Sequence, residues 1–575
     1  MLYEKLHKIE QIMFDALALG LVLFYSYSAV LEPAATQYHR GIYIIITYML
    51  VFMLYRTPTV WGRVWDYILI AASIGSIGYW IVNFEAINYR AGAETELDKW
   101  IAMVGVLIGV ELARRVVGSV FVIIGAIMLL YGVYGEYAPE IISHAGDTFP
   151  DLCTSIFYKS DGVFGIMANV LATYIILFVI FGAFLERSGA QRFFIDFPLA
   201  AVGHKIGGPA KVSVIASGLF GSISGSAIAN TVSTGAFTIP MMKKAGFRPH
   251  VAGGIEPAAS IGGMFMPPIM GAGGFIMAEL TGVPYSTIML VAIFPALMYF
   301  FSVFVMVHYE AKRFNIVGER SKESAKEILK KEWFYVLPLV IITIFMLLGY
   351  SPGYSAILGI VACIVVSWFR KDTRIDLKGF LEASRAGAES SLKIGATVGV
   401  IGIIIGVLTY SGLVLTFADI VIELADGALW LTILLIALAS LILGMGVPVT
   451  AAYLITAVVA VPALTELGVN PIAAHMIVYW LSQDSNITPP VCIAAFAGAT
   501  IAKANMWKTA FTSFKFAKFL YLGPFLFGYV PGFSLDGTAK DIAVTFILIL
   551  IGTYGYAWLL SGIWLDWFKK SPVKT

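Results

Sequence analysis

The stretch Gly221–Pro268, GSISGSAIANTVSTGAFTIPMMKKAGFRPHVAGGIEPAASIGGMFMPP, recurs in altered letters 222 residues later in the chain. The residues that keep this spacing without a gap are Pro240 and Pro462, Gly246 and Gly468, Pro249 and Pro471, Ala252 and Ala474, Ser260 and Ser482, and the pairs Pro267-Pro268 and Pro489-Pro490. Proline and glycine matched at one offset, inside long apolar regions, are typical of transporters built by internal duplication. We therefore predict two copies of one membrane-embedded core, at 212–278 and 429–501.

The composition excludes a soluble globular protein. Of the 575 residues, 59% are hydrophobic and only 13% are charged, whereas soluble domains contain about 25% charged residues. The mean hydropathy is +0.85, and a net charge of +2 does not indicate a nucleic-acid partner. The sequence contains no HExxH, GxxxxGK(S/T) or GxSxG motif. We expect a polytopic membrane protein in the lipid bilayer, without enzyme activity and without a cofactor.

Apolar segments of about 20 residues, the length that crosses a bilayer, divide the chain into spans. We predict spans at 11–31, 41–55, 66–84, 100–114, 116–135, 163–186, 286–307, 334–350, 355–369, 391–415, 519–533 and 542–568, with re-entrant hairpins at 212–242 and 429–466 and interrupted spans at 250–278 and 472–501. With a cytoplasmic N-terminus, this topology puts 33 of the 38 Lys and Arg in cytoplasmic segments, in agreement with the positive-inside rule. The first hairpin then opens to the cytoplasm and the second to the outside, so the repeats are inverted and the C-terminus is cytoplasmic.

Irregular backbone at membrane depth is tolerated only where it is buried in protein or lines a cavity. Four such segments are predicted: the hairpin tips 222–230 and 444–453 and the helix breaks 260–268 and 482–490. Each Pro-Pro pair removes two backbone donors and frees the carbonyls upstream. Free carbonyls with Ser, Thr and Asn oxygens suit a hard cation such as Na⁺, and the N-termini of half-helices favour an anion.

The polar residues of these segments divide into two groups. We expect cation ligands among Ser224, Ser226, Asn230, Asn486 and Thr488, because they fall within breaks that the repeat marks. We interpret Ser213, Ser217 and Ser440, which lie outside the tips, as helix-packing residues.

The run GSISGSAIANTVSTGAFTIPMMKKAG, followed by AASIGGMFMPPIMGAGGFIMAE and ALTELGVNPIAAHMIVYWLSQDSNITPP, resembles the membrane component of tripartite ATP-independent periplasmic (TRAP) transporters. The resemblance covers most of residues 160–530 and is to the branch whose binding protein is of the TAXI type. Residues 1–135 resemble the small membrane subunit, fused here to the large one. The resemblance implies an elevator-type importer of carboxylates, usually Na⁺-coupled, that receives its substrate from a soluble periplasmic binding protein.

The resemblance also implies two cation sites that hold Na⁺. One would be lined by Ser224, Ser226, Asn230 and the carbonyls of Gly262 and Gly263, which we call the first cage. The other, the second cage, would be lined by Gly444, Gly446, Thr450, Ser485, Asn486 and Thr488. We expect the small organic anion to bind beside Ser222, Ser260, Pro267, Pro268, Pro489 and Pro490.

Three segments with different roles are expected along the chain. Residues 1–135 would form scaffold helices, 136–162 a periplasmic connector, and 163–575 the inverted-repeat transport module. The first apolar run has no small-residue cleavage site and is expected to remain as a helix. The protein would lie in a bacterial or archaeal cytoplasmic (inner) membrane.

Two intramembrane acids leave the coupling ion open. Glu256 and Asp484 lie near the breaks, and Asp484 departs from the family pattern. A buried acid at such depth is a candidate for proton coupling, whereas the two oxygen cages favour Na⁺. The alternatives are a proton-coupled carboxylate importer of the same architecture, and a channel or scaffold without coupled transport.

Overall fold

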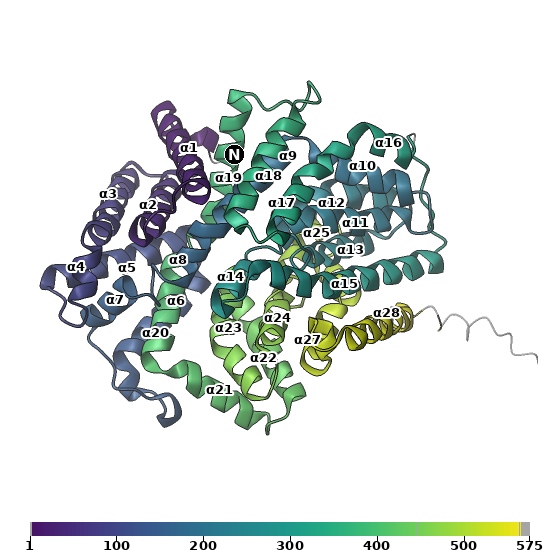
Figure 1. Cartoon of the computed structure of the whole chain (residues 1–575). Coiled ribbons are helices and arrows are strands. Elements are labelled where there is room, and N and C mark those ends of the chain that lie inside the picture. Colours follow the sequence, from purple (N-terminus) through teal and green to yellow (C-terminus); the bar gives the residue numbers. More distant parts are fainter. Residues whose placement is uncertain (1–2, 322, 446, 563, 565–575) are drawn as a thin grey trace, which may run out of the picture. The chain divides into compact units, whose positions relative to one another are not determined.

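The computed structural model describes residues 3–321, 323–445, 447–562 and 564 (Figure 1). Every regular element in these residues is a helix, which confirms the predicted all-α fold class. Eight of the described helical segments are long and apolar enough to cross a membrane. The short 3₁₀ segments are η1 (Tyr3–Lys5), η2 (Gly135–Tyr137), η3 (Glu140–Ile142), η5 (Trp333–Val336), η6 (Asp484–Asn486) and η7 (Pro531–Ser534).

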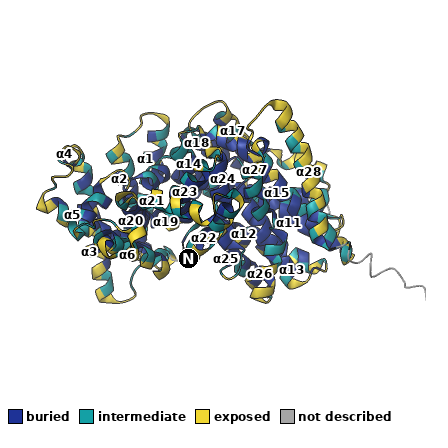
Figure 2. Cartoon of the chain, turned by 90° about the horizontal axis from the view of Figure 1, so that it is seen from below, coloured by how far each residue is buried: buried dark blue, intermediate teal, exposed yellow. Residues whose placement is uncertain are grey.

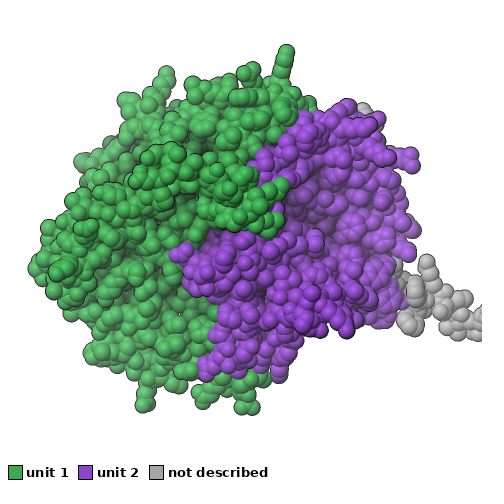
Figure 3. All heavy atoms as spheres, in the orientation of Figure 1, with its two compact units in different colours: residues 1–188, 344–428, 446–463 green, residues 189–343, 429–445, 464–575 purple. Residues whose placement is uncertain are grey.

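The chain forms two compact units, which Figure 3 shows in different colours. Unit 1 contains residues 1–188, 344–428 and 446–463, and unit 2 contains 189–343, 429–445 and 464–575. Both units therefore combine segments from distant parts of the sequence. The boundaries predicted at 135 and 162 follow from the sequence alone and stay a prediction.

Unit 1 begins with the helices of the segment that was predicted as scaffold. Its helices are α1 (Lys8–Val30), α2 (Thr36–Leu54), α3 (Val60–Val82), α4 (Phe84–Tyr89), α5 (Glu96–Val116), α6 (Ser119–Tyr134), α7 (Phe149–Tyr158), α8 (Ile166–Val170), a π-helical turn η4 (Leu171–Ile175), α9 (Ile176–Arg187), α18 (Pro352–Ser367), α19 (Leu377–Gly395), α20 (Val398–Ser411), α21 (Leu413–Leu424) and most of α23 (Val449–Glu466). The five early spans each overlap one of these helices. Helix α17 (Leu337–Leu347) crosses the division between the units.

Ion pairing and close backbone contact join distant parts of the sequence within unit 1. The Arg385 guanidinium on α19 donates two hydrogen bonds of 2.6 Å to the Asp15 carboxylate on α1. A Cβ atom on Gly109 of α5 would lie 3.0 Å from the Gly399 Cα of α20. Glycine permits these two helices to approach closely, as it does at helix crossings in membranes.

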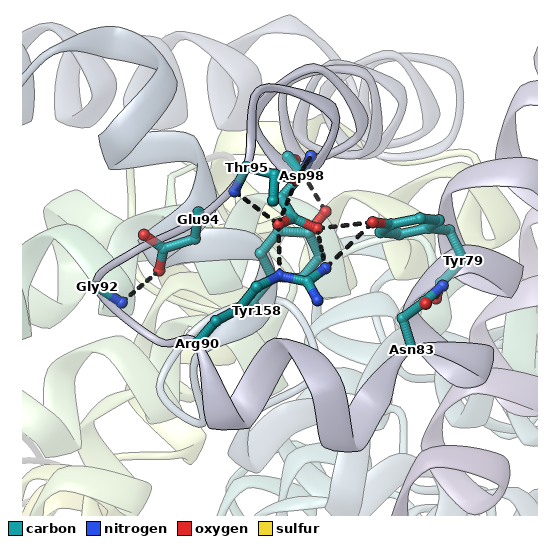
Figure 4. Close-up of polar contacts among 8 residues, drawn as sticks. All are labelled: Tyr79, Asn83, Arg90, Gly92, Glu94, Thr95, Asp98 and Tyr158. Atoms are coloured by element: carbon teal, nitrogen blue, oxygen red, sulfur yellow. Dashed lines mark hydrogen bonds and ion pairs between the residues drawn. The ribbon is translucent and has the colours of Figure 1, made fainter.

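A buried ionic cluster fixes the start of α5 (Figure 4). The Asp98 side chain is fully buried, and the Arg90 guanidinium donates to both of its oxygens over 2.8 and 2.7 Å. The Tyr79 hydroxyl donates to the same carboxylate over 2.8 Å, as does the Thr95 amide over 2.8 Å. The Tyr158 hydroxyl donates to the Asp98 carbonyl over 2.9 Å. Helices α3, α5 and α7 are thus joined at one residue, Asp98, through its carboxylate and its backbone carbonyl.

Unit 2 contains the first predicted core and most of the second. Its helices are α10 (Ala190–Val202), α11 (Gly208–Ser224), α12 (Ala227–Lys244), α13 (Pro249–Gly262), α14 (Gly273–Thr281), α15 (Tyr285–Arg313), α16 (Ala325–Glu332), α22 (Leu429–Gly444), α24 (Pro471–Leu481), α25 (Ile493–Ala502), α26 (Met506–Phe516), α27 (Phe519–Tyr529) and α28 (Ala539–Ser561). All residues of α13 from Val251 to Gly262 are buried, whereas most of α28 is exposed (Figure 2). Helix α13 is therefore the centre of this unit, and α28 has the exposed apolar surface that suits contact with lipid.

The 222-residue repeat is visible in the helix boundaries. Helix α12 runs from Ala227 to Lys244, and α23 runs from Val449 to Glu466, which is the same interval 222 residues later. Helices α13 and α24 begin at residues 249 and 471, and α9 and α20 at 176 and 398. The predicted duplication is therefore confirmed at the level of secondary structure.

Both predicted hairpins and both predicted breaks coincide with interruptions between helices. Helix α11 ends at Ser224, and α12 begins at Ala227 after Gly225, whose φ of +61° is favourable for glycine. The Ser226 hydroxyl accepts from the Ala229 amide and caps the N-terminus of α12. The α13–α14 and α24–α25 interruptions span 263–272 and 482–492.

Candidate functional site

The first hairpin and the first break meet at a close backbone contact. A Cβ atom on Gly263 would lie 2.4 Å from the Gly221 Cα, and one on Gly221 would lie 2.6 Å from the Asn230 Nδ2. Glycine at both positions allows the end of α11 to touch the break after α13. The structure thereby brings together Asn230 and Gly263, two of the predicted residues of the first cage.

Asn230 is fully buried and held in a fixed orientation. Its Nδ2 donates to the Ser217 carbonyl over 2.9 Å, and its Oδ1 lies 3.4 Å from the Thr234 hydroxyl. The strong contact is made by the nitrogen, so the side-chain oxygen keeps most of its capacity to accept. An amide oxygen in that state is a suitable ligand for a hard cation.

The tip of the first hairpin also contacts the break. A Cβ atom on Gly225 would lie 3.2 Å from the Gly271 Cα. The Ser226 side chain caps α12, and the Ser224 hydroxyl reaches only the Ser226 carbonyl, over 3.5 Å. The two serines of the first cage therefore line the tip, with Ser224 the less constrained of the pair.

Two buried tyrosine hydroxyls bond to backbone carbonyls on both sides of the Pro267-Pro268 pair. The Tyr285 hydroxyl lies 2.8 Å from the Pro268 carbonyl and 2.6 Å from that of Ile269. The Tyr479 hydroxyl lies 2.8 Å from the Met264 carbonyl and 2.5 Å from that of Met270. None of these four carbonyls is among the predicted ligands of the first cage, so the tyrosines fix the shape of the break without occupying the predicted cation ligands.

The glycine carbonyls of the first cage also have backbone partners. The Gly262 oxygen accepts from the Phe265 amide over 3.1 Å, and the Gly263 oxygen accepts from the Met266 amide over 3.3 Å. Each carbonyl oxygen has two lone pairs, so one such bond leaves room for a further ligand. The predicted role of these two carbonyls is compatible with the geometry.

Glu256 is enclosed by a clamp of four hydroxyls, which we call the hydroxyl clamp. Its carboxylate is fully buried on α13. Ser213 and Ser217 on α11 each donate to it over 2.5 Å, and Thr234 and Thr238 on α12 also donate to it. Four donors satisfy both carboxylate oxygens without a basic partner. The clamp joins the two arms of the hairpin to α13.

Sequence reasoning missed most of this clamp. Ser213 and Ser217 were interpreted as helix-packing residues, and the structure corrects that interpretation because both donate across a helix interface to Glu256. The signal was present as spacing: Ser213 and Ser217 are four residues apart, as are Thr234 and Thr238. Hydroxyls at that spacing lie on one helix face. In the structure, one such face of α11 and one of α12 both contact the buried Glu256 carboxylate.

The second cage is only partly assembled within unit 2. A Cβ atom on Gly444 would lie 2.5 Å from the Ser485 hydroxyl oxygen, so glycine makes room for that side chain. Asn486 Nδ2 donates to the Gln483 carbonyl over 3.3 Å, and the Thr488 hydroxyl bonds to the Tyr521 hydroxyl. Thr450 lies on α23, in unit 1. Gly446 lies outside the described residues.

Two neighbouring side chains in the second break have buried atoms without a hydrogen-bond partner. Gln483 is 0% exposed, and both its amide oxygen and its amide nitrogen lack a partner. Asp484 is 2% exposed, and its Oδ1 lacks a partner. Buried polar atoms in native proteins almost always have a hydrogen-bond partner, so these three atoms require an explanation. Gln483 was not among the predicted site residues.

The residues predicted to bind substrate differ in their environment. The Ser222 hydroxyl donates to the Leu219 carbonyl of its own helix over 2.8 Å. Ser260 is buried, 3.5 Å from the Glu256 carboxylate. Among the prolines, Pro268 is buried, Pro267 and Pro489 are half-buried, and Pro490 is exposed. Ser222 and Ser260 therefore already have intramolecular partners.

The residues of the first cage fit a small hard cation. Asn230 Oδ1 and two carbonyls with remaining lone pairs are hard oxygen donors, the type that Na⁺ prefers over sulfur or imidazole. The Glu256 carboxylate lies one hydrogen-bonded residue away, through Thr234. A fixed negative charge at that place favours cation binding nearby.

Comparison with known proteins places the chain in a family. Residues 104–533 match the model of the family described as "Tripartite ATP-independent periplasmic transporter, DctM component". A "Putative TRAP transporter large permease protein" of Haemophilus influenzae is 27% identical over 55% of this chain and 74% of its own length. The "2,3-diketo-L-gulonate TRAP transporter large permease protein YiaN" of Escherichia coli is 25% identical over 62% of this chain and 83% of its own.

A third relative is named for a different substrate. The "C4-dicarboxylate TRAP transporter large permease protein DctM" of Pseudomonas aeruginosa is 25% identical over 62% of this chain and 84% of its own length. The family match covers well over half of the 575 residues. The chain therefore belongs to the DctM component family of tripartite ATP-independent periplasmic transporters.

Proposed function

We propose that the protein is a secondary active importer of organic anions across the cytoplasmic membrane, driven by a Na⁺ gradient. The observation that carries the proposal is the meeting of Asn230 and Gly263 at Gly221. It joins a hairpin tip to a helix break and leaves hard oxygen donors at the junction. An ion bound there would hold the hairpin against α13, and so would link its own binding to the conformation of the transport module.

Carboxylates are the proposed substrate class. Two relatives are named for 2,3-diketo-L-gulonate and for C4-dicarboxylates, both of which are organic acids. Helix N-termini at the tips and breaks, such as that of α12 at Ala227, supply backbone amides and a positive dipole end. Both features suit a carboxylate that needs no basic side chain in the membrane.

The proposed partner is a periplasmic substrate-binding protein of the TAXI type. We further propose that residues 1–135 act as a fused small subunit and support the transport module as it moves in an elevator-type cycle. The Arg385–Asp15 pair between α19 and α1 is the kind of contact that such a scaffold would use. Both termini would be cytoplasmic.

Uptake into proteoliposomes tests the proposal. The purified protein would be reconstituted, and radiolabelled C4-dicarboxylate or other organic acids would be offered with the binding protein encoded beside it. We expect uphill uptake that needs both an inward Na⁺ gradient and the binding protein. Uptake that follows an imposed pH gradient without Na⁺ would favour proton coupling through Glu256 or Asp484. Flux that needs no gradient would show a channel.

A further inference from the structure

A buried lysine without an acidic partner lies in the first turn of α11. The Lys211 side chain is 6% exposed. Its Nζ lies 3.1 Å from the Nδ1 of His308 on α15 and 5.0 Å from the centre of the Phe304 ring. Among the described residues, no Asp or Glu forms an ion pair with Lys211. A buried cation that has lost its hydration is unfavourable unless an anion compensates its charge.

His308 has an unused donor beside this charge. A lysine ammonium has N–H donors and no acceptor, so Lys211 donates in this contact and the His308 Nδ1 accepts. The hydrogen of the neutral imidazole is then on Nε2, which donates to no group of the described residues. The His308 side chain is only half-buried. The pair therefore has N–H groups from both side chains available for an anion.

Two exposed lysines flank the pair. Lys312 follows His308 by four residues on α15 and so lies on the same helix face. Lys205 is held near the end of α15, because the Gly318 amide donates to its carbonyl over 3.4 Å. Lys205 lies within electrostatic range of Lys211, and Lys312 lies within range of His308. We call these four residues the basic cluster.

Backbone contacts hold the start of α11 against α15. Gly207 has a φ of +66°, which glycine adopts without strain, and a Cβ atom on it would lie 2.8 Å from the Ala311 Cβ. The Gly207 amide also donates to the Ile316 carbonyl over 2.9 Å. The fold therefore fixes how closely the basic groups of the two helices approach each other.

The acid nearest in sequence is engaged elsewhere. Glu310 lies between His308 and Lys312 in the chain, and it is 4% exposed. Its carboxylate pairs with Arg248 over 3.0 Å and with Lys515 over 3.1 Å. Glu310 is thus shared by two other cations and does not neutralise the basic cluster.

The basic cluster belongs to one half of the duplicated chain. The residues 222 positions after its members are all uncharged, namely Gly427, Ile433, Val530 and Ser534. The positive-inside rule explains Lys and Arg in cytoplasmic loops. Orientation in the membrane does not require a buried lysine, so the burial of Lys211 needs a further reason.

We propose that the basic cluster binds a phosphate group. Its members combine one buried charge, two exposed charges and a neutral N–H donor, and a phosphate can accept from all of them. The predicted span 286–307 ends just before His308, which puts the cluster at the level of the lipid headgroups on the predicted cytoplasmic side. Basic sites between helices on that side bind anionic headgroups. This position favours an anionic phospholipid over a soluble phosphate as the source, and the inference does not depend on the proposed function.

Thermal unfolding of the full chain tests the site. The protein would be purified in an uncharged maltoside detergent and washed free of lipid. Unfolding temperatures would be measured as phosphatidylglycerol or phosphatidylcholine is added, and in potassium phosphate against potassium chloride at equal potassium concentration. The variants are Lys211→Met, the double variant Lys205→Gln with Lys312→Gln, and the control Lys371→Gln, at an exposed lysine after α18. A ligand that binds only the folded state raises its stability with concentration.

We expect phosphatidylglycerol to raise the unfolding temperature of the wild type and of Lys371→Gln, and phosphatidylcholine to leave it unchanged. Each lysine removed from the basic cluster should raise the phosphatidylglycerol fraction needed for the same gain about fivefold. Without lipid, Lys211→Met should unfold at a higher temperature than the wild type, because the buried charge is gone. The double variant changes only exposed side chains, so it serves if Lys211→Met does not accumulate.

Stabilisation by potassium phosphate alone, lost in the same variants, would keep the phosphate site and assign it to a soluble ligand. Three results would overturn the proposal. They are a wild type that neither phosphatidylglycerol nor phosphate stabilises, equal stabilisation by phosphatidylcholine, and a phosphatidylglycerol response that both Lys211→Met and the double variant retain in full.

Discussion

The hydroxyl of Tyr479, on α24, lies 2.8 Å from the carbonyl oxygen of Met264, in the break after α13. A side chain of the second repeat thus satisfies an acceptor that the first repeat leaves free. The same hydroxyl reaches the Met270 carbonyl over 2.5 Å, so its proton bridges the two ends of the break. The irregular backbone of one repeat is therefore stabilised by the other.

Tyr479→Phe should destabilise the protein by about 1–3 kcal/mol, because it leaves buried carbonyls without a donor while it keeps the ring. The matched control is Tyr529→Phe, at a side chain that is 53% exposed. Thermal unfolding of both variants in the same detergent measures the difference. Equal unfolding temperatures would show that the Tyr479 hydroxyl does not support the break.

Glu256→Gln tests the hydroxyl clamp. The amide group presents one acceptor in place of two, and its nitrogen faces hydroxyls that donate, so part of the clamp loses its partner. We expect destabilisation on the order of 2–4 kcal/mol, seen as a lower unfolding temperature. Glu423→Gln, at an exposed acid on α21, is the control. A variant as stable as the wild type would mean that the hydrogen bonds of the four hydroxyls do not require a charged carboxylate at position 256.

Gly263→Ala should abolish uptake without preventing insertion into the membrane. The added Cβ would lie 2.4 Å from the Gly221 Cα, and backbone atoms cannot rotate out of the way. The junction of α11 with the break would open and displace Asn230. Gly75→Ala is the control, since nothing lies within 4 Å of its added Cβ. Normal uptake by Gly263→Ala would show that this contact does not form part of the site.

The Asp98 cluster predicts a pH dependence of stability. Asp98 lies in the first turn of α5, before the predicted span 100–114. The Arg90 guanidinium holds the pKa of Asp98 well below its usual value of 3.8, against the opposing effect of burial and with help from Thr95. The stabilisation is therefore present above pH 3.8 and is lost as the pH falls further towards the lower pKa of the folded state.

Asp98→Asn removes this contribution. We expect the unfolding temperature of the variant to be well below that of the wild type at pH 7. The difference between the two unfolding temperatures should narrow as the pH falls below about 4. This difference is obtained by measuring the unfolding temperatures of the wild type and Asp98→Asn between pH 3 and pH 7, with Asp419→Asn, at an exposed acid on α21, as the control. A gap that stays constant with pH would contradict the assignment of the stabilisation to the charged carboxylate.

The inverted topology can be tested at two positions that the repeat makes equivalent. Lys244 and Glu466 end α12 and α23 and are both exposed, and the three native cysteines are buried. A cysteine at Lys244 should react with an impermeant reagent only from the cytoplasm, and one at Glu466 only from outside. Labelling of both from one face would show that the repeats are not inverted.

The sequence was sufficient for the helices and the duplication because both depend on local and periodic signals. Apolar runs of bilayer length define the spans, and Pro and Gly define where helices stop. Helices α12 and α23 occupy the same interval 222 residues apart, as the matched prolines predict.

The partners of the polar atoms could not be predicted, because they depend on which helix faces meet. Nothing near Met264 in the sequence indicates that Tyr479 would satisfy its carbonyl. The same reason explains why Ser213 was assigned to packing although it donates to Glu256. Local sequence identifies the free acceptors, and only the fold identifies the donors.

Simultaneous measurement of ²²Na⁺ and radiolabelled substrate influx into proteoliposomes distinguishes Na⁺-coupled import from uncoupled or proton-coupled transport. With the binding protein present, we expect substrate entry to be accompanied by Na⁺ entry in a fixed ratio, and we expect Asn230→Ala to lower both together. Substrate entry without Na⁺ entry, or Na⁺ entry that is independent of substrate, would contradict Na⁺-coupled import.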